Sequence, residues 1–251
     1  MVVHQELVKK MYENKIIGHL IKDSFPIEAR EKAQKKEGTP KERKKANKAR
    51  LAKERREGNS RKQKQLREPC PNRMIEELPK ACDIGSKTSP DGHKQFWRGY
   101  KFHLASTDGC IPIACVITSA SLNDCEAAIP LAAQANLLVT NFYDLMDSAY
   151  DTQEIKEYSL RLGHIPIIDP GSRTKEQKAK KQAELEARKA IRIEPAEVVR
   201  YKNRFPGERI NAQILDYYGG RNITVKGHCK IYCHMMFGVL ALTASSLFNL
   251  L

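Results

Sequence analysis

Two aspartates, Asp23 and Asp147, each come directly after a short apolar run of the kind that forms a β-strand. Carboxylates that end neighbouring strands at one edge of a sheet can share a pair of divalent cations. Mg²⁺ takes few protein oxygens, keeps several waters and binds substrate phosphates. Two such ions can activate an attacking oxygen and stabilise a leaving one. Aspartates at strand ends are also common on ordinary surfaces, so this spacing alone permits a metal site without requiring one.

The elements that must position these carboxylates follow from the hydrophobic pattern. Residues 99–107 alternate apolar Tyr100, Phe102 and Leu104 with polar neighbours, which is typical of a half-buried strand. Asp108-Gly109 is a hairpin signal. We expect strands at residues 16–22, 99–107, 111–118, 142–146 and 165–168, and helices at 121–136 and 152–162. Strands joined by a hairpin and then alternating with helices predict an α/β fold, a mixed sheet with helices packed on it.

Positive charge is concentrated in one part of the chain. The 251 residues carry 44 Lys and Arg against 30 Asp and Glu, a net charge of +14, and Glu28–Glu68 alone holds 17 basic and 7 acidic residues. Such a run buries little apolar area, so it is a solvated helix or is disordered until it meets a partner. A basic run of this kind favours a polyanion such as nucleic acid. Arg173–Arg192 has a similar composition and forms a second charged insert.

Composition excludes collagen-like, wholly disordered and disulfide-rich secreted proteins. The chain has seven cysteines and opens without a secretory pattern, so we expect free thiols in a reducing cytoplasm. Met235–Leu251 is apolar, but four polar residues interrupt it, and we interpret it as a buried helix rather than a membrane span. Cys229 and Cys233, flanked by two histidines, resemble zinc ligands but lack a second cysteine pair at zinc-finger spacing.

Several blocks, taken in order, resemble those of bacterial insertion-sequence DDE transposases. The first acidic block is Lys22–Lys32, and the second, Leu145–Asp151, contains Asp147. The third has the pattern Tyr-x-x-Arg-x-x-x-Glu, here Tyr201, Arg204 and Glu208. Between and after them, similar blocks occur at Trp97–Leu104, Ile117–Asp124, Gly163–Pro170, Tyr218–Asn222 and Val225–His228.

This resemblance implies a ribonuclease-H-like fold in which Asp23, Asp147 and Glu208 form the catalytic and metal-binding triad. Mg²⁺ would be the cofactor, with Mn²⁺ able to substitute. The implied reaction is cleavage at the ends of an insertion sequence, followed by attack of the freed 3′-OH on target DNA. The expected partner is double-stranded DNA, bound by a homo-oligomer in the bacterial cytoplasm at the nucleoid, with no membrane. Contacts to DNA are expected from Tyr201, Arg204, Arg209, Lys44, Lys45, Arg50, Arg55 and Arg56.

The chain departs from the family pattern at three points. The family usually has a Lys seven residues after the Glu, and here that residue is Leu215. Pro206-Gly207 precedes Glu208, so we expect the helix that carries Glu208 to start late or to be kinked. The family also has a helical domain before the first Asp, whereas about 15 residues precede the first strand expected here. We therefore expect a catalytic core without that domain.

The expected organisation is a first-strand region at residues 1–27, a basic insert at 28–81, the central core at 82–172, a charged insert at 173–196 and a helical part at 197–251. An active transposase core is one hypothesis, and a truncated DNA-binding remnant without catalysis is the other. An RNA-binding protein is a distant third, because the ordered acidic blocks argue against it. We also expect Asp144 to point away from Asp147, Asp151 to cap the next helix, and His103 to lie on the surface.

Overall fold

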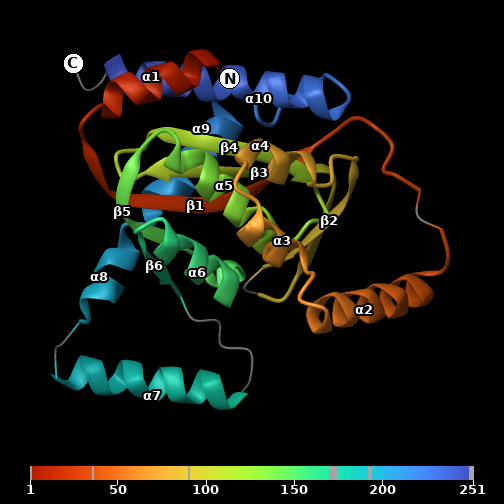
Figure 1. Ribbon diagram of the computed structural model, residues 1–251, viewed down its shortest axis with the longest axis horizontal. Coiled ribbons are helices and arrows are strands. Elements are labelled where there is room, and N and C mark those ends of the chain that lie inside the picture. The colour runs from red at the N-terminus through yellow and green to blue at the C-terminus, as the bar shows by residue number, and fades with distance from the viewer. Residues whose placement is uncertain (1, 36, 90, 170–174, 192–193, 249–251) are drawn as a thin grey trace.

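A six-stranded mixed sheet forms the centre of the protein, in a computed structural model that describes residues 2–35, 37–89, 91–169, 175–191 and 194–248 (Figure 1). The strand order is β2-β3-β1-β5-β6, with β4 also paired to β3. The strands are β1 (Ile16–Glu28), β2 (Asp83–Thr88), β3 (Lys94–Thr107), β4 (Pro112–Ser119), β5 (Thr140–Met146) and β6 (Ile165–Ile168). β3 is antiparallel to β1, β2 and β4, whereas β1, β5 and β6 run parallel. The expected mixed sheet is therefore confirmed.

Helices cover both faces of this sheet. The helices are α1 (Val2–Tyr12), α2 (Pro40–Arg56), α3 (Arg61–Arg67), α4 (Pro71–Glu76), α5 (Ala128–Asn136), α6 (Gln153–Arg161), α7 (Lys175–Ile191), α8 (Ala196–Lys202), α9 (Phe205–Asp216) and α10 (His228–Phe248), with short 3₁₀ turns η1 (Asp124–Glu126) and η2 (Ser148–Tyr150). Phe25 and Phe102 pack against α9 and α10 in one core cluster. Leu20 and Ala105 pack with residues of α1 and α5 in another. Because β1 and β3 are covered on both sides, they lie at the centre of the fold.

β1 is longer than its apolar pattern indicates, which changes the position of Asp23. The strand does not end at Asp23 but continues to Glu28, with Phe25 and Ile27 buried. Its pairing with β5 stops at Lys22, so the rest of the strand has only β3 beside it. Pro26 is tolerated in that stretch because a strand with one open side can spare an N–H. Asp23 therefore lies where β5 ends, rather than where β1 ends.

β2 was not expected from the sequence. Its only large apolar residue, Ile84, is mostly exposed, so the segment has no periodic hydrophobic signal. The strand forms because β3 extends beyond the end of β1, and Lys94–Gly99 need a partner for their backbone groups. The α6 cap also differs from the expectation. Thr152 is the N-cap, whereas Asp151 pairs with Lys156 at 2.6 Å.

The basic insert divides into two parts. α2 stands away from the sheet with its described side chains largely exposed (Figure 1). In contrast, α3 and α4 pack on the core, where Met74 and Leu78 are buried and the buried Gln65 donates to the Glu126 carbonyl at 2.9 Å. α7 also stands apart from the sheet in Figure 1. Residues 170–174 and 192–193, at its two ends, lie outside the described residues.

α10 is long and apolar enough to cross a membrane by length and composition alone, and it is the one such helix in the described part of the chain. In the fold it lies against the sheet. Ile231, Met235, Val239 and Leu242 are buried in the same core cluster as Phe25 and Phe102. This packing accounts for its apolar character as that of a core helix.

Candidate active site

Asp23 and Asp147 meet at one edge of the sheet because of the parallel pairing of β1 with β5. In that register Lys22 lies opposite Met146, so the next residue of each chain segment is one of the two aspartates. Asp147 directly follows β5 and caps η2, with its carboxylate accepting the Ala149 N–H at 2.9 Å. Neither carboxylate is freely exposed, and the Asp23 side chain is only 16% accessible. The two aspartates therefore lie on neighbouring strands, as the sequence indicated.

Glu208 reaches the same edge from α9. The expected late start or kink is wrong, since α9 begins at Phe205 and contains Pro206 in its first turn, where a missing N–H is harmless. Gly207 explains the composition of this turn. A Cβ at Gly207 would lie 2.5 Å from the Ile21 Cγ2, so only glycine lets α9 approach β1 this closely. Pro206-Gly207 thus brings Glu208 to the sheet instead of weakening its helix.

One guanidinium joins the three carboxylates. Arg204 Nη1 contacts Glu208 Oε1 at 2.7 Å, and Arg204 Nη2 lies 4.0 Å from both Asp23 Oδ1 and Asp147 Oδ2. Asn211 donates to Asp23 Oδ2 at 2.9 Å and holds that carboxylate from the other side. Arg204, Glu208 and Asn211 follow the spacing i, i+4, i+7, so they share one face of α9. Helical spacing from Arg204 is the signal by which the sequence could have identified Asn211.

The charges at this edge are only partly compensated. Burial raises the pKa of Asp23 to about 6, and the nearby Asp147 adds to the rise, while Arg204 opposes it. Burial likewise raises the pKa of Asp147. The positive charge of Lys87, on β2, lowers the pKa of both carboxyls. Lys87 lies on the strand that the sequence did not predict, so no local pattern marked it as part of the site.

The donor set is suited to a hard divalent cation. Among the described residues, no group of three or more His, Cys, Asp or Glu side chains is arranged to hold a metal ion. The Arg204 guanidinium contacts the three carboxylates instead. The oxygens of Asp23, Asp147 and Glu208 are nevertheless the ligands that Mg²⁺ prefers, and Mg²⁺ needs only one or two of them. Burial is the main cause of the raised pKa of Asp23, and a bound cation would stabilise the buried carboxylate. The chemistry of these oxygens therefore suits a divalent cation.

The other predicted DNA contacts lie in two places. Tyr201 is half-buried against Ile21 and Leu145 beside the carboxylates, and burial raises its pKa. Arg209 is exposed on α9. Leu215, at the position where the family pattern has a lysine, packs against the core. On α2, the side chains of Lys45, Arg50 and Arg56 are exposed, and those of Lys44 and Arg55 lie outside the described residues.

A buried ion pair supports β1 and β5 from the opposite face. Lys22 and Asp144 contact each other at 2.7 Å and are almost fully buried. Ser159, on α6, donates to Asp144 at 2.7 Å. Burial alone would raise the pKa of Asp144, but Lys22 and His164 outweigh it and hold that pKa well below its usual range. Asp144 therefore points away from Asp147, as the alternation of the strand predicts, and fastens β5 to β1.

Asp124 forms a second polar cluster on the face of β1 opposite Asp23. It accepts from Ser24 Oγ at 2.8 Å and pairs with Lys101 Nζ at 2.9 Å. The expectation for His103 is wrong, because its side chain is fully buried in this region and bonds Thr118 Oγ1 at 2.9 Å. Helices cover both faces of β3, so the polar positions of its alternating pattern are buried as well. Burial lowers the pKa of His103 to about 4.

The zinc alternative finds no support in the geometry. His228 bonds the Ile117 carbonyl at 3.1 Å and His234 bonds the Gly219 carbonyl at 2.9 Å. Cys229 and Cys233 are exposed on α10 as free thiols. The two histidines thus fasten α10 to β4 and to the turn after α9, which is a structural role.

A family model of the transposase DDE domain matches residues 15–244. The match includes all three carboxylates, Arg204 and both charged inserts. The chain belongs to the transposase DDE domain family. Comparison with curated proteins and with solved structures gives no match.

Membership of this family gives the fold its name. The mixed sheet with β1 and β5 parallel and β3 antiparallel to β1 is a ribonuclease-H-like sheet. The family has DNA as its partner and generally uses divalent metal ions. The transposase domain thus contains the acidic edge described above, with one carboxylate from β1, one from the end of β5 and one from α9.

Proposed function

We propose that this protein cleaves insertion-sequence DNA and transfers the freed strand, using Asp23, Asp147 and Glu208 as its catalytic carboxylates. The observation that carries the proposal is the convergence of these three side chains, from β1, η2 and α9, on Arg204. Three separate elements meet at this point, and each has a local feature that brings its carboxylate there. These features are the β1–β5 register, the Asp147 cap and the close approach at Gly207.

The residues of the chain have distinct roles in this proposal. Asn211 orients the Asp23 carboxylate by donating to one of its oxygens. Arg204 supplies a positive charge where a phosphodiester must enter, and its planar guanidinium suits two phosphate oxygens at once. Tyr201 lies beside Arg204, half-buried, with its hydroxyl near the acidic edge. The protein thereby positions the DNA and neutralises its charge, which is the main requirement in phosphoryl transfer.

Asp23, Asp147 and Glu208 would hold Mg²⁺, or Mn²⁺ in its place. When bound, such ions activate the attacking oxygen and stabilise the leaving one. Arg204 contacts all three carboxylates. A cation bound there would compensate their negative charge, and the guanidinium could then turn to the DNA. We also propose that the protein works as a homo-oligomer on double-stranded DNA, in the bacterial cytoplasm at the nucleoid.

The proposal is tested by nicking of supercoiled plasmid DNA with and without Mg²⁺ or Mn²⁺. Nicking should require the metal and should be lost in Asp147→Asn and in Glu208→Gln. Asp151→Asn is the matched control, since Asp151 is a nearby aspartate whose carboxylate pairs with Lys156. This control should nick DNA at the wild-type rate.

A measurement of DNA binding distinguishes the active transposase from the non-catalytic DNA-binding remnant. In the proposed enzyme, Asp147→Asn abolishes nicking and retains DNA binding. If the wild-type protein binds DNA but does not nick it with either metal, the protein is a non-catalytic DNA-binding remnant. Equal loss of nicking in Asp151→Asn would show that the assay reports folding rather than the chemistry of Asp147.

A further inference from the structure

A cavity of about 700 Å³ lies between α2 and the loop that leads into η1. From α2 its wall is formed by Arg43, Asn47, Arg50 and Leu51. The facing wall is formed by Arg61, Pro79, Ser121, Leu122, Asn123 and Glu126. Three arginines thus line a space in which Glu126 is the only acidic residue of the lining. We call this space the α2 groove.

The arginines of α2 that face the groove follow the helical repeat. Arg43, Asn47 and Arg50 have the spacing i, i+4, i+7, so they form one face of the helix. Arg50 donates to Glu54 and to Asn47, which holds its guanidinium along this face. The Arg43 Nε–H is buried and has no acceptor among the described residues. A buried donor without a partner can bind an acceptor that arrives from outside the chain, such as a phosphate oxygen.

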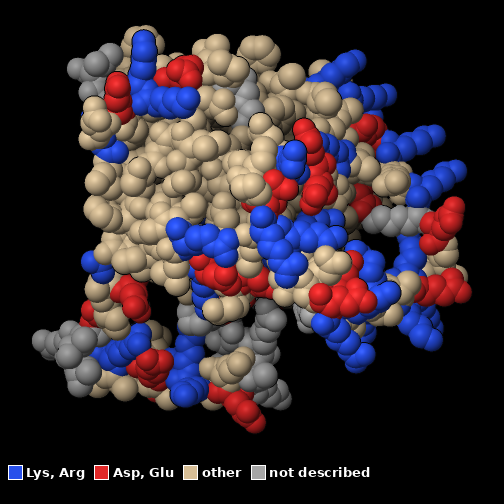
Figure 2. All heavy atoms as spheres, in the orientation of Figure 1, with Lys and Arg blue, Asp and Glu red and all other residues tan. Residues whose placement is uncertain are grey.

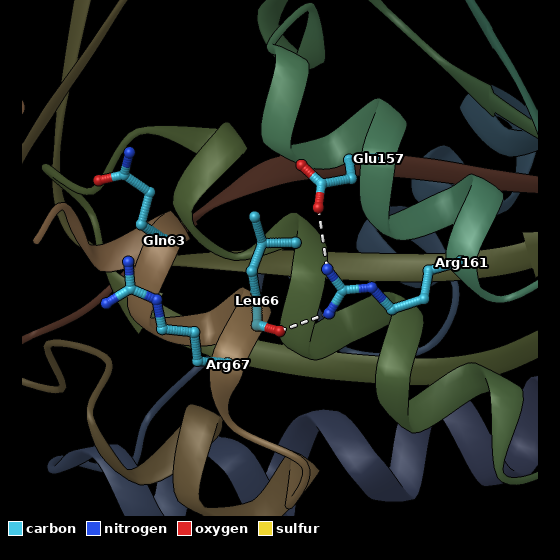
Figure 3. Close-up of a pocket in the computed structure, with 5 residues that line it drawn as sticks. All are labelled: Gln63, Leu66, Arg67, Glu157 and Arg161. Carbon is cyan, nitrogen blue, oxygen red and sulfur yellow. Dashed lines mark hydrogen bonds and ion pairs between the residues drawn. The ribbon is translucent and has the colours of Figure 1, made fainter. Parts of the chain in front are cut away.

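The facing wall is fixed to the core. Arg61 pairs with Glu126, and Gln65 donates to the Glu126 carbonyl, so α3 is attached to η1. The other side of α3 is attached to α6, where Arg161 donates to the Leu66 carbonyl at 2.6 Å and pairs with Glu157 at 2.9 Å (Figure 3). The α2 groove therefore has a rigid wall opposite Arg43 and Arg50.

The cavity in Figure 3 is a weaker candidate for a binding site. It measures about 590 Å³ and lies between α3 and α6. One of its two arginines, Arg161, is already engaged by Leu66 and Glu157, and the other, Arg67, reaches the Gly58 carbonyl at 3.3 Å. Its contacts explain how α3 is held in place. Among the described residues that line it, none has a buried donor without an acceptor, whereas Arg43 in the α2 groove has one.

A short path of contacts connects the α2 groove to β1, the strand that carries Asp23. Asn123, on its wall, directly precedes Asp124, which accepts from Ser24 at 2.8 Å. Ser24 is the neighbour of Asp23 on β1. Lys and Arg side chains also gather around α2 and the segment that leads into it (Figure 2). Ser24 and Asp23 point to opposite faces of β1, so a polyanion that reaches both the groove and the carboxylates must pass the edge beside Asp147, which lies near Asp124.

We propose that the α2 groove binds the sugar-phosphate backbone of the DNA that occupies the acidic edge, with Arg43 and Arg50 as the phosphate ligands. This inference rests on the proposed function and makes it more specific. The basic insert then acts through one face of α2, and the remaining lysines of the helix contribute only a diffuse charge. Arginine suits this role because its guanidinium binds phosphate oxygens in a bidentate manner.

The test compares two pairs of substitutions in α2 that remove equal charge at equal spacing. Arg43→Ala with Arg50→Ala removes the groove face. Lys41→Ala with Lys48→Ala removes two exposed lysines that are also seven residues apart. Binding of the full chain to a fluorescent DNA duplex is measured between 50 and 200 mM salt. The groove pair should weaken binding at least tenfold and reduce the slope of log K against log salt by about two, whereas the lysine pair should change affinity less than threefold.

A third variant controls for the possibility that the substitutions unfold α2. Asn123 caps η1 by accepting the Cys125 N–H, and Asp is an equally good cap, so Asn123→Asp adds a negative charge to the groove without altering α2. It should also weaken binding, by about three- to tenfold. Equal effects of the arginine and lysine pairs, or unchanged binding in Asn123→Asp, would overturn the proposal. Metal-dependent nicking that persists in such a result would leave the proposed function standing, whereas absence of any DNA binding by the wild type would remove both.

Discussion

Replacing Asp23 by asparagine should stabilise the metal-free protein at neutral and alkaline pH. Asp23 is a buried carboxyl whose pKa rises from 3.8 to about 6 on folding. The substitution removes the charge and keeps the shape, and the new side chain can still accept the hydrogen bond from Asn211. The variant therefore avoids the free-energy cost of burying a carboxylate beside Asp147 without a sufficient counter-charge.

The magnitude follows from the pKa. A rise from 3.8 to about 6 corresponds to at most about 3 kcal/mol at a pH well above 6. Between these two values the folded protein binds more protons than the unfolded chain, so the stability of the wild type falls as the pH rises. The asparagine side chain of the variant does not titrate, so the variant lacks this loss. The gain in the free energy of unfolding should approach about 3 kcal/mol at pH 8 and vanish near pH 4.

The comparison must be made as a difference between the two proteins, because His103 acts in the opposite sense. Burial lowers the pKa of His103 to about 4, so the unfolded chain binds the extra proton below about pH 6.5. Its contribution to stability is complete above that pH and is lost as the pH falls towards 4. Subtracting the wild-type curve from that of the variant removes this contribution.

The assay is urea unfolding of wild type and Asp23→Asn from pH 4 to pH 8, with a chelator present. Asp216→Asn is the control, since Asp216 is a surface carboxylate paired with Arg221 at 2.6 Å. The difference in the free energy of unfolding between Asp216→Asn and the wild type should not increase as the pH rises. Mg²⁺ at pH 8 should then stabilise the wild type, because it binds only the folded state, and should have little effect on Asp23→Asn. A variant that is less stable than wild type at pH 8, or a difference that does not change with pH, would refute the reasoning.

Three further substitutions test the site and its supports. Glu208→Gln should abolish metal-dependent nicking while changing the free energy of unfolding by less than about 0.5 kcal/mol, since Glu208 is exposed; a large loss of stability in urea would contradict this. Asp144→Asn should cost about 3–5 kcal/mol because it leaves the Lys22 ammonium buried without its counter-charge, and a thermal melt that matches wild type would disprove it. Gly207→Ala should cost about 1–3 kcal/mol and slow nicking, because its Cβ would meet Ile21 at 2.5 Å and push α9 outward. Wild-type nicking by that variant would show that the approach of α9 is not needed.

Much of the fold can be predicted from local pattern. The alternation of Tyr100, Phe102 and Leu104 marks β3, and the apolar runs around it give β4 and β5 in the right order. Asp23, Asp147 and Glu208 could be selected as one set because their surrounding blocks resemble those of a known family. Alternation also predicts correctly that Asp144 and Asp147 point to different faces of the sheet.

The sequence by itself therefore indicated the three carboxylates that the structure brings to one edge of the sheet. Only the tertiary structure showed that Arg204 contacts all three, that Asn211 holds Asp23 and that β2 brings Lys87 near them. It also decided that His103 is buried, because α5 covers a face of β3 whose polar residues suggest exposure. The physical reason is that periodicity records the preference of a segment for burial on one side. Which distant segment covers that side, and which charges meet there, depends on pairing between residues far apart in the chain.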